Sequence, residues 1–280
     1  MKSIQVHIRA LRLSCIALAC ASVALRSSSP FAAEQRESII DKIQHEGTLH
    51  VCVAISVPWM MKDPTSDKFI GFDADMMGML AQEMEVKLDL VGFPNFGQLI
   101  AGLQAGRCDL IAPFVRTTKR AVAVAFSETY FTLGTVWAVN KDKSTATTLK
   151  DLDVPATVVA VEQGTLSEQR TKTHLPNATI KSLQGGGDAQ RIAEVQSGRS
   201  TATALDSIKV PIYRQEFSWM RFIPPNGFDE PVDRAGLAYA VRREDLDFVN
   251  LLNVFIWNLK ANGTIDGLIA KWVNPKWFRH

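Results

Sequence analysis

The chain lacks the sequence features that mark membrane-spanning, nucleic-acid-binding or metal-binding proteins. Beyond its first 33 residues, no stretch approaches the roughly 20 consecutive apolar residues that a membrane-spanning helix needs. No basic run carries interleaved aromatic residues, as nucleic-acid-binding segments do. His45, His50 and His174 show no spacing typical of a metal site. A nucleophile elbow, a phosphate-binding loop and a dinucleotide fingerprint are also missing. We therefore expect a protein without cofactor or metal.

Cysteine is scarce, and only Cys52 and Cys108 lie beyond residue 33. Cys52 falls in the middle of an expected strand, and Cys108 precedes the strand that we expect beside it. A disulfide is chemically possible if the chain is exported. Bridges between neighbouring parallel strands are geometrically awkward, so we expect two buried free thiols.

The N-terminal segment is typical of an export signal. Basic residues precede an apolar run at 13–25, and a polar stretch follows it. We expect residues 1–33 to be a signal peptide with cleavage near Ala33. Cys20 is an alternative site of processing, at which a lipid anchor would be attached. Either reading places the protein outside the cytoplasm, in the periplasm.

The apparent basic charge of the chain comes from this segment. Four of the 31 basic residues and none of the 29 acidic residues lie within residues 1–33. The remainder therefore has a net charge near −2, which argues against a nucleic-acid partner. About 247 residues remain, which is enough for two lobes with separate cores.

The first half of the remaining chain alternates between strand and helix patterns. A nearly continuous apolar run at residues 48–57 predicts a buried parallel strand. Helical spacing of apolar residues follows it, with Asp73 or Asp75 placed to cap the helix. Further patterns indicate strands at 86–91 and 109–113 and a helix at 96–103. Such alternation predicts a doubly wound α/β lobe.

The same alternation begins again in the second half of the chain. A strand at 157–161 leads to Thr165, which has capping-box spacing to Glu168 and should begin a helix. A glycine run introduces another helix, and a strand at 201–205 ends at Asp206. The clearest amphipathic helix covers residues 248–259.

Five segments between Gly71 and Tyr130 resemble the polar amino-acid-binding family of periplasmic solute-binding proteins, the receptors of ABC importers. These segments are Gly71–Asp75, Phe96–Ile100, Gly106–Ile111, Thr117–Arg120 and Phe126–Tyr130. The resemblance implies two doubly wound α/β lobes, joined by two hinge strands near 131–139 and 234–241, with a ligand cleft between them. Lobe 1 would comprise residues 34–132 and 236–280, and lobe 2 residues 133–235.

The resemblance also assigns the residues that would hold an α-amino acid. Arg120 matches the arginine that clamps the ligand carboxylate, which suits the forked guanidinium. Thr117 and Thr118 precede it and would contact the same carboxylate. From lobe 2, Thr165 at a helix start would provide a further anion contact, and Asp206 would bind the ammonium. Thr165 is also a helix cap in either case, and Asp206 alternatively caps the helix that follows it.

The side-chain pocket departs from the family pattern. The family's ligand-stacking aromatic falls on Ser56, and Trp59 is a possible substitute. Phe96 is either a pocket residue or a core residue. Glu162 stands where some relatives carry lysine, and Leu166 replaces a smaller residue. An aspartate common near the first strand is missing, so we expect a ligand with a neutral side chain unless Glu162 takes that role.

The leading hypothesis is a monomeric receptor that captures a small α-amino acid or a close analogue and delivers it to an inner-membrane ABC permease. A cyclohexadienyl dehydratase on the same scaffold is the alternative enzyme, with Glu162 as its candidate acid. Against that role, a solvated glutamate at the cleft rim is the plainer interpretation of Glu162. A third hypothesis is a ligand-sensing partner of a membrane receptor.

Overall fold

The computed structural model describes residues 37–273. The expected signal peptide, its cleavage at Ala33 and the alternative anchor at Cys20 all lie outside the described residues. Within this range, no helix combines the length and apolar character that crossing a membrane requires.

One mixed sheet runs through the described chain in the order β4-β1-β5-β12-β7-β10-β8-β9, with β11 paired to β7 and β6 paired to β12. Its strands are β1 (Thr48–Ala54), β4 (Lys87–Phe93), β5 (Leu110–Val115), β6 (Val124–Phe126), β7 (Phe131–Asn140), β8 (Val158–Glu162), β9 (Thr179–Leu183), β10 (Ala202–Asp206), β11 (Met220–Ile223) and β12 (Val232–Arg242). A separate small hairpin joins β2 (Met61–Lys62) to β3 (Phe69–Ile70).

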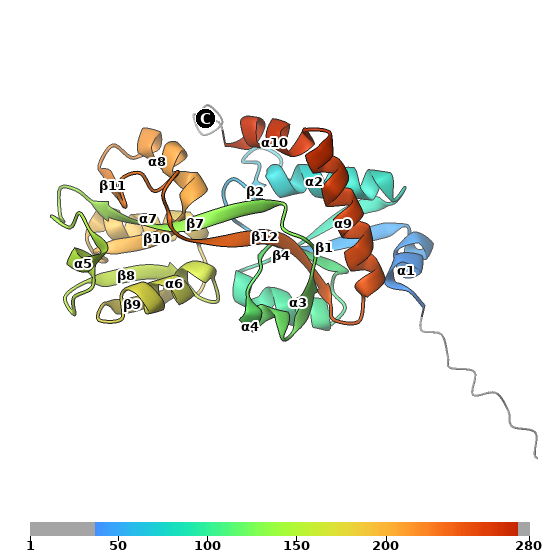
Figure 1. Cartoon of the computed structure of the whole chain (residues 1–280), viewed down its shortest axis with the longest axis horizontal. Coiled ribbons are helices and arrows are strands. Elements are labelled where there is room, and N and C mark those ends of the chain that lie inside the picture. The colour runs from blue at the N-terminus through green and yellow to red at the C-terminus, as the bar shows by residue number, and fades with distance from the viewer. Residues whose placement is uncertain (1–36, 274–280) are drawn as a thin grey trace, which may run out of the picture. The chain divides into compact units, whose positions relative to one another are not determined.

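The helices divide into two groups around this sheet (Figure 1). The β1 half combines β1, β4 and β5 with helices α1 (Ile39–Glu46), α2 (Phe72–Glu83), η1 (Phe96–Gln98), α3 (Leu99–Gln104), α4 (Thr118–Ala121), α9 (Leu246–Ala261) and α10 (Thr264–Trp272). The β8 half combines β8, β9, β10 and β11 with helices α5 (Leu149–Leu152), α6 (Leu166–His174), α7 (Gly187–Ser197), η2 (Ser207–Lys209) and α8 (Val210–Glu216).

The long antiparallel strands β7 and β12 pair with each other between the two halves. β12 also pairs with β5, whereas β7 also pairs with β10, so the β7–β12 pair links the two regions of the sheet. Figure 1 shows them crossing side by side from one group of elements to the other. The prediction of two α/β lobes joined by two hinge strands is confirmed.

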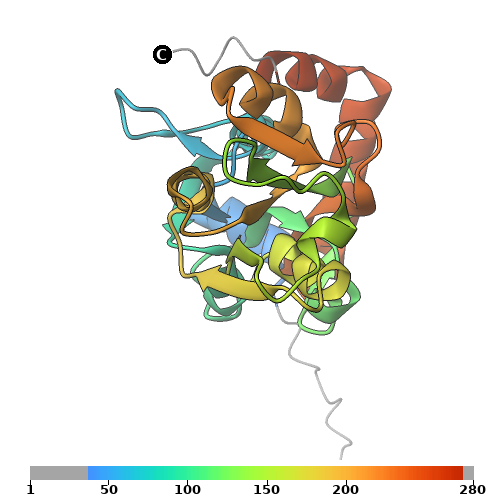
Figure 2. The same ribbon diagram turned by 90° about the vertical axis from the view of Figure 1, so that its left-hand side faces the viewer.

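The β8 half has an apolar core on each face of its strands. Alternate residues of β7 point to opposite faces: Trp137 and Val139 belong to one core, and Val136 and Ala138 to the other. Figure 2 views this half end-on, with helices on both sides of the strands. This is the doubly wound arrangement that strand–helix alternation favours.

The C-terminal helices return to the β1 half, as the family resemblance implied. Helix α9 contacts α1, β6 and β12, and α10 contacts α2. Phe248, Leu252 and Phe255 of α9 are buried in the same core as Leu49 and Val51 of β1. The apolar face of α9, which the pattern at residues 248–259 predicted, thus packs against the β1 half of the sheet.

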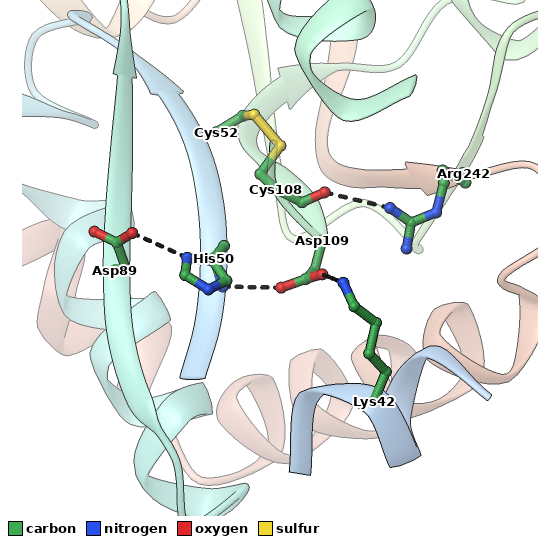
Figure 3. Close-up of a disulfide and its surroundings, with 7 residues drawn as sticks. All are labelled: Lys42, His50, Cys52, Asp89, Cys108, Asp109 and Arg242. Carbon is green, nitrogen blue, oxygen red and sulfur yellow. Dashed lines mark hydrogen bonds and ion pairs between the residues drawn. A yellow bond between two sulfur atoms is a disulfide. The ribbon is translucent and has the colours of Figure 1, made fainter. Parts of the chain in front are cut away.

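The expectation of two free thiols is wrong, because Cys52 and Cys108 form a disulfide (Figure 3). β1 and β5 pair through Cys52 and Ile111, so Cys108 lies before β5 begins rather than opposite Cys52 within the ladder. The bridge therefore joins a strand residue to a residue just outside the neighbouring strand, and not two residues opposite each other in a parallel pair. The resulting Cα–Cα distance of 5.5 Å lies in the normal range for a disulfide.

The expected cap of α2 is also wrong. The N-cap is Gly71, and no side chain caps this helix. Asp73 instead lies inside the first turn, fully buried, where it accepts a hydrogen bond from the Tyr130 hydroxyl at 2.6 Å. The backbone of Gly71 approaches Trp59 so closely that a Cβ there would lie 2.5 Å from the Trp59 carbonyl oxygen. This close approach explains why glycine begins the helix.

Candidate functional site

A cavity of about 60 Å³ lies between the two halves. Arg120 contributes to its wall from the β1 half, and Glu162 and Asp206 contribute from the β8 half. The two acidic residues end neighbouring parallel strands, β8 and β10. The cavity therefore lies at the carboxyl ends of strands, where open α/β sheets generally bind their ligands.

Arg120 connects the two halves directly. Its Nη1 donates to the Val115 carbonyl oxygen at 2.8 Å, and its Nη2 donates to the Gly164 carbonyl oxygen at 2.9 Å. The guanidinium carbon lies 3.8 Å from the centre of the Phe114 ring. Burial lowers the pKa of Arg120 to about 10, so the group remains charged at neutral pH. Among the described residues, no carboxylate lies within ion-pair distance of this guanidinium.

Two of the three predicted threonines, Thr117 and Thr165, form helix caps. Thr117 caps the turn that carries Arg120, because its hydroxyl accepts from the Arg120 N–H at 3.2 Å. Thr118 is exposed. Thr165 begins α6 as predicted and accepts from the Glu168 N–H at 3.3 Å. The capping box is not reciprocal, however, because the Glu168 carboxylate accepts from the Gly164 N–H instead of the Thr165 N–H.

Asp206 forms an ion pair and does not cap the turn that follows it. No capping hydrogen bond from its side chain is present, and its carboxylate lies 3.1 Å from Lys209 Nζ. Lys209 also lies 2.9 Å from Asp188 Oδ2, and Asp188 is further paired with Arg191. The Tyr213 hydroxyl donates to Asp188 at 2.7 Å. These bonds join five side chains of the β8 half into one network.

The network keeps its buried groups charged. Burial by itself raises the pKa of Asp188, but Lys209 and Arg191 together lower it to about 2. Burial also disfavours the charge on Lys209, yet Asp188 and Asp206 raise its pKa above the ordinary value. Opposite charges at this distance favour the ionised forms. The β8 half therefore presents paired charges at the cavity wall.

Glu162 is not the solvated rim residue that its sequence position suggested. Its side chain is only 4% exposed. Burial raises the pKa of its carboxyl group, and the nearby Arg191 only partly opposes this effect. Within residues 37–273, the carboxyl forms no ion pair or hydrogen bond with another side chain or with the backbone. An acidic group thus faces the cavity without a partner.

The remaining predicted pocket residues lie together. Ser56, Trp59, Phe96 and Leu166 all line the cavity, and Trp59 is 1% exposed. The Trp59 ring packs edge-to-face against Phe72 and Phe131. Trp59 is therefore a core residue that also lines the cavity. Phe96 combines both of its expected roles, since it also packs against the core on the disulfide side of the sheet.

A second cavity, of about 330 Å³, is also lined by Arg120. Phe96, Arg120, Thr165 and Leu166 line both cavities. Thr117 lines only this second cavity, and Thr118 lines neither of the two. Arg120 is therefore common to the two cavities, and the structure does not bring Thr117 and Thr118 into the smaller one.

Sequence reasoning missed Asp188, Arg191 and Lys209. Arg191 follows Asp188 by three residues, and Lys209 follows Asp206 by three. That spacing is typical of side-chain pairs on a helix. The three-residue spacing could therefore have indicated each ion pair from the sequence. The contact between Lys209 and Asp188, which joins the pairs, depends on how α7 and η2 meet in space.

The chain is similar in sequence to known solute-binding proteins. Residues 49–275 match the family model of bacterial extracellular solute-binding proteins, family 3. The arginine-binding extracellular protein ArtP of Bacillus subtilis is 26% identical over 208 residues, covering 74% of this chain and 78% of that protein. The histidine-binding periplasmic protein of Escherichia coli is 24% identical over 213 residues, covering 73% and 79%.

Solved structures show the same fold. An ancestral amino-acid-binding protein, described as a precursor of cyclohexadienyl dehydratase, has a TM-score of 0.76 and 31% identity, covering 85% of this chain and all of that chain. A binding component of an ABC transporter from Wolinella succinogenes, complexed with lysine, has a TM-score of 0.75 and 28% identity, covering 84% and 99%.

Proposed function

Since this chain belongs to family 3 of the bacterial extracellular solute-binding proteins, we propose that it is the receptor component of an ABC importer and captures a small α-amino acid between its two halves. Residues 34–132 with 236–280 would form one lobe and residues 133–235 the other. The observation that carries the proposal is the Arg120 guanidinium, which has no carboxylate partner among the described residues and lines the same cavity as Glu162 and Asp206.

An α-amino acid matches this arrangement of charges. Its carboxylate suits the two parallel donors of Arg120, and its ammonium suits Asp206, whose side chain is 24% exposed. Thr165, at the start of α6, would add a contact to the carboxylate through the helix N-terminus. Two of the similar proteins support an amino-acid ligand. ArtP of Bacillus subtilis is named as an arginine-binding protein, and the ABC-transporter binding component from Wolinella succinogenes was solved in complex with lysine.

The protein would act in the periplasm as a monomer, with an inner-membrane permease as its partner. It would bind its ligand without transforming it. The ancestral neighbour related to cyclohexadienyl dehydratase is itself an amino-acid-binding protein. Its likeness keeps the dehydratase as a second candidate, for which the buried Glu162 is the favouring observation.

Calorimetric titration of the purified protein with the common amino acids tests the proposal. We expect at least one dissociation constant below roughly 100 μM, or about −5.5 kcal/mol. Binding confined to sugars or polyamines would contradict it. Incubation with prephenate or arogenate, followed by detection of the aromatic product, separates the enzyme from the receptor.

A further inference from the structure

Charged side chains of both signs line the 60 Å³ cavity in equal number. The three basic residues are Arg120, Arg191 and Lys209, and the three acidic residues are Glu162, Asp188 and Asp206. Arg120 is the basic residue from the β1 half; the other five come from the β8 half. The β8 half therefore contributes one more carboxyl group than it contributes basic groups.

Existing ion pairs show which carboxyl group is in excess. Arg191 pairs with Asp188, and Lys209 lies between Asp188 at 2.9 Å and Asp206 at 3.1 Å. These two basic groups compensate two of the three carboxylates. Glu162 remains, 4% exposed and without an ion pair in the described part of the chain. Leaving such a group unpaired in a buried site is costly, so a ligand that donates to it gains affinity.

We propose that this site selects amino acids of zero net charge, and that Glu162 supplies the negative charge that balances the ligand ammonium beside Asp206. The proposal rests on the proposed function and specifies its ligand class. It also assigns a binding role to Glu162, a residue whose position in the sequence does not distinguish a binding role from a solvated one.

A zwitterion completes the charge pairing of the cavity. Its carboxylate compensates Arg120, and its ammonium compensates the single excess negative charge of the β8 half. An arginine or lysine ligand would add one more positive charge after every carboxylate had been compensated. In a buried site, an uncompensated charge is far more costly than in water. The apolar wall formed by Trp59, Leu133 and Leu237 offers no further partner for such a charge.

Calorimetry with five probes tests this selectivity: alanine, leucine, glutamine, arginine and lysine. For the wild-type protein, we expect the tightest of the three uncharged amino acids to bind at least tenfold more tightly than arginine and lysine. Glu162→Gln preserves the shape of the side chain and removes the charge. We expect this variant to bind that uncharged amino acid at least tenfold more weakly than the wild type.

A charge-adding variant tests the same balance in the opposite direction. Ile55 lines the cavity and is 41% exposed, so Ile55→Asp adds a carboxylate without removing a core side chain. We expect the affinity for arginine or lysine, divided by the affinity for the uncharged probes, to be at least tenfold higher in this variant than in the wild type. Thermal unfolding monitored by circular dichroism checks that both variants are folded.

The outcomes separate this proposal from the proposed function. Wild-type protein that prefers arginine or lysine would overturn the ligand class and leave the amino-acid receptor intact. A folded Glu162→Gln variant with wild-type affinity would overturn the role of Glu162. Failure of every amino acid to bind the wild type would instead reject the proposed function itself.

Discussion

The Arg120 guanidinium donates a hydrogen bond to the Gly164 carbonyl oxygen at 2.9 Å, across the boundary between the two halves. Gly164 also approaches Gly97, since a Cβ on Gly164 would lie 2.8 Å from the Gly97 Cα. The side chain expected to clamp a carboxylate thus already contacts the loop that begins α6. Binding and the approach of the two halves therefore involve the same residues.

Replacing Arg120 by alanine should weaken ligand binding by about 2–5 kcal/mol, or roughly 30- to 5000-fold, because the ligand carboxylate loses its partner in a buried site. Titration calorimetry measures the change. The exposed Arg116→Ala is the matched control and should bind normally. A folded Arg120→Ala variant with unchanged affinity would show that the carboxylate is held elsewhere.

Replacing Asp206 by asparagine should weaken binding to a comparable extent, because the ligand ammonium loses a charged acceptor. Lys209 keeps Asp188 as its partner in this variant, so the fold should survive. The exposed Asp229→Asn provides the control for a change of net charge. Equal affinities of the Asp206 and Asp229 variants would remove Asp206 from the site.

Ligand binding should bring the two halves closer together, because Arg120 and Asp206 must converge on one small molecule. Small-angle scattering should show a smaller radius of gyration at saturating ligand. Gly164→Ala should reduce this change and the affinity, since Gly164 has a φ of +78° and contacts Gly97. An unchanged radius in the wild type would contradict the closing mechanism while leaving binding intact.

Loss of the Cys52–Cys108 disulfide should destabilise the fold. The two cysteines are 56 residues apart in the sequence, and closing a loop of that length is worth about 4 kcal/mol by its effect on the unfolded chain. The double variant Cys52→Ala/Cys108→Ala should therefore unfold at lower denaturant concentration. Neither cysteine lines the two cavities around Arg120, so ligand affinity measured on folded protein should not change.

The buried Asp73 should make stability depend on pH. Burial raises its pKa to about 7, well above the ordinary value of 3.8. Between these values the folded state binds more protons than the unfolded state, so the free energy of unfolding should fall as pH rises toward 7, by at most about 1.4 kcal/mol per pH unit. Asp73→Asn should flatten this profile in denaturant titrations from pH 5 to 8.

An exposed aspartate provides the control for that profile. Asp142→Asn changes a carboxylate on the surface and should leave the pH dependence as in the wild type. If Asp73→Asn and the wild type show the same slope, the Asp73 carboxyl group titrates as an ordinary aspartate.

The sequence patterns predicted the strand–helix alternation of both halves, and the family resemblance predicted how two hinge strands join them. A buried strand or an amphipathic helix can be predicted from residues that are close in the sequence, because burial on one face or on both faces leaves a periodic pattern of apolar residues. The strands around Cys52 and Ala160, the N-cap at Thr165 and helix α9 were therefore predictable. The family resemblance singled out Arg120, which lines the cavity, and its role as a carboxylate clamp stays a prediction.

The features that could not be predicted depend on contacts between segments that are distant in the sequence. The disulfide depends on the segment just before β5 lying beside Cys52, with a Cα–Cα distance of 5.5 Å. Glu162 is buried at the end of β8 near Asp188 and Arg191, although its sequence context is compatible with a solvated rim. The pairing of Lys209 with both Asp188 and Asp206 joins two elements that local spacing does not relate. Burial and charge compensation arise from packing across the chain, and they determine which carboxyl group is left without an ion pair among the described residues.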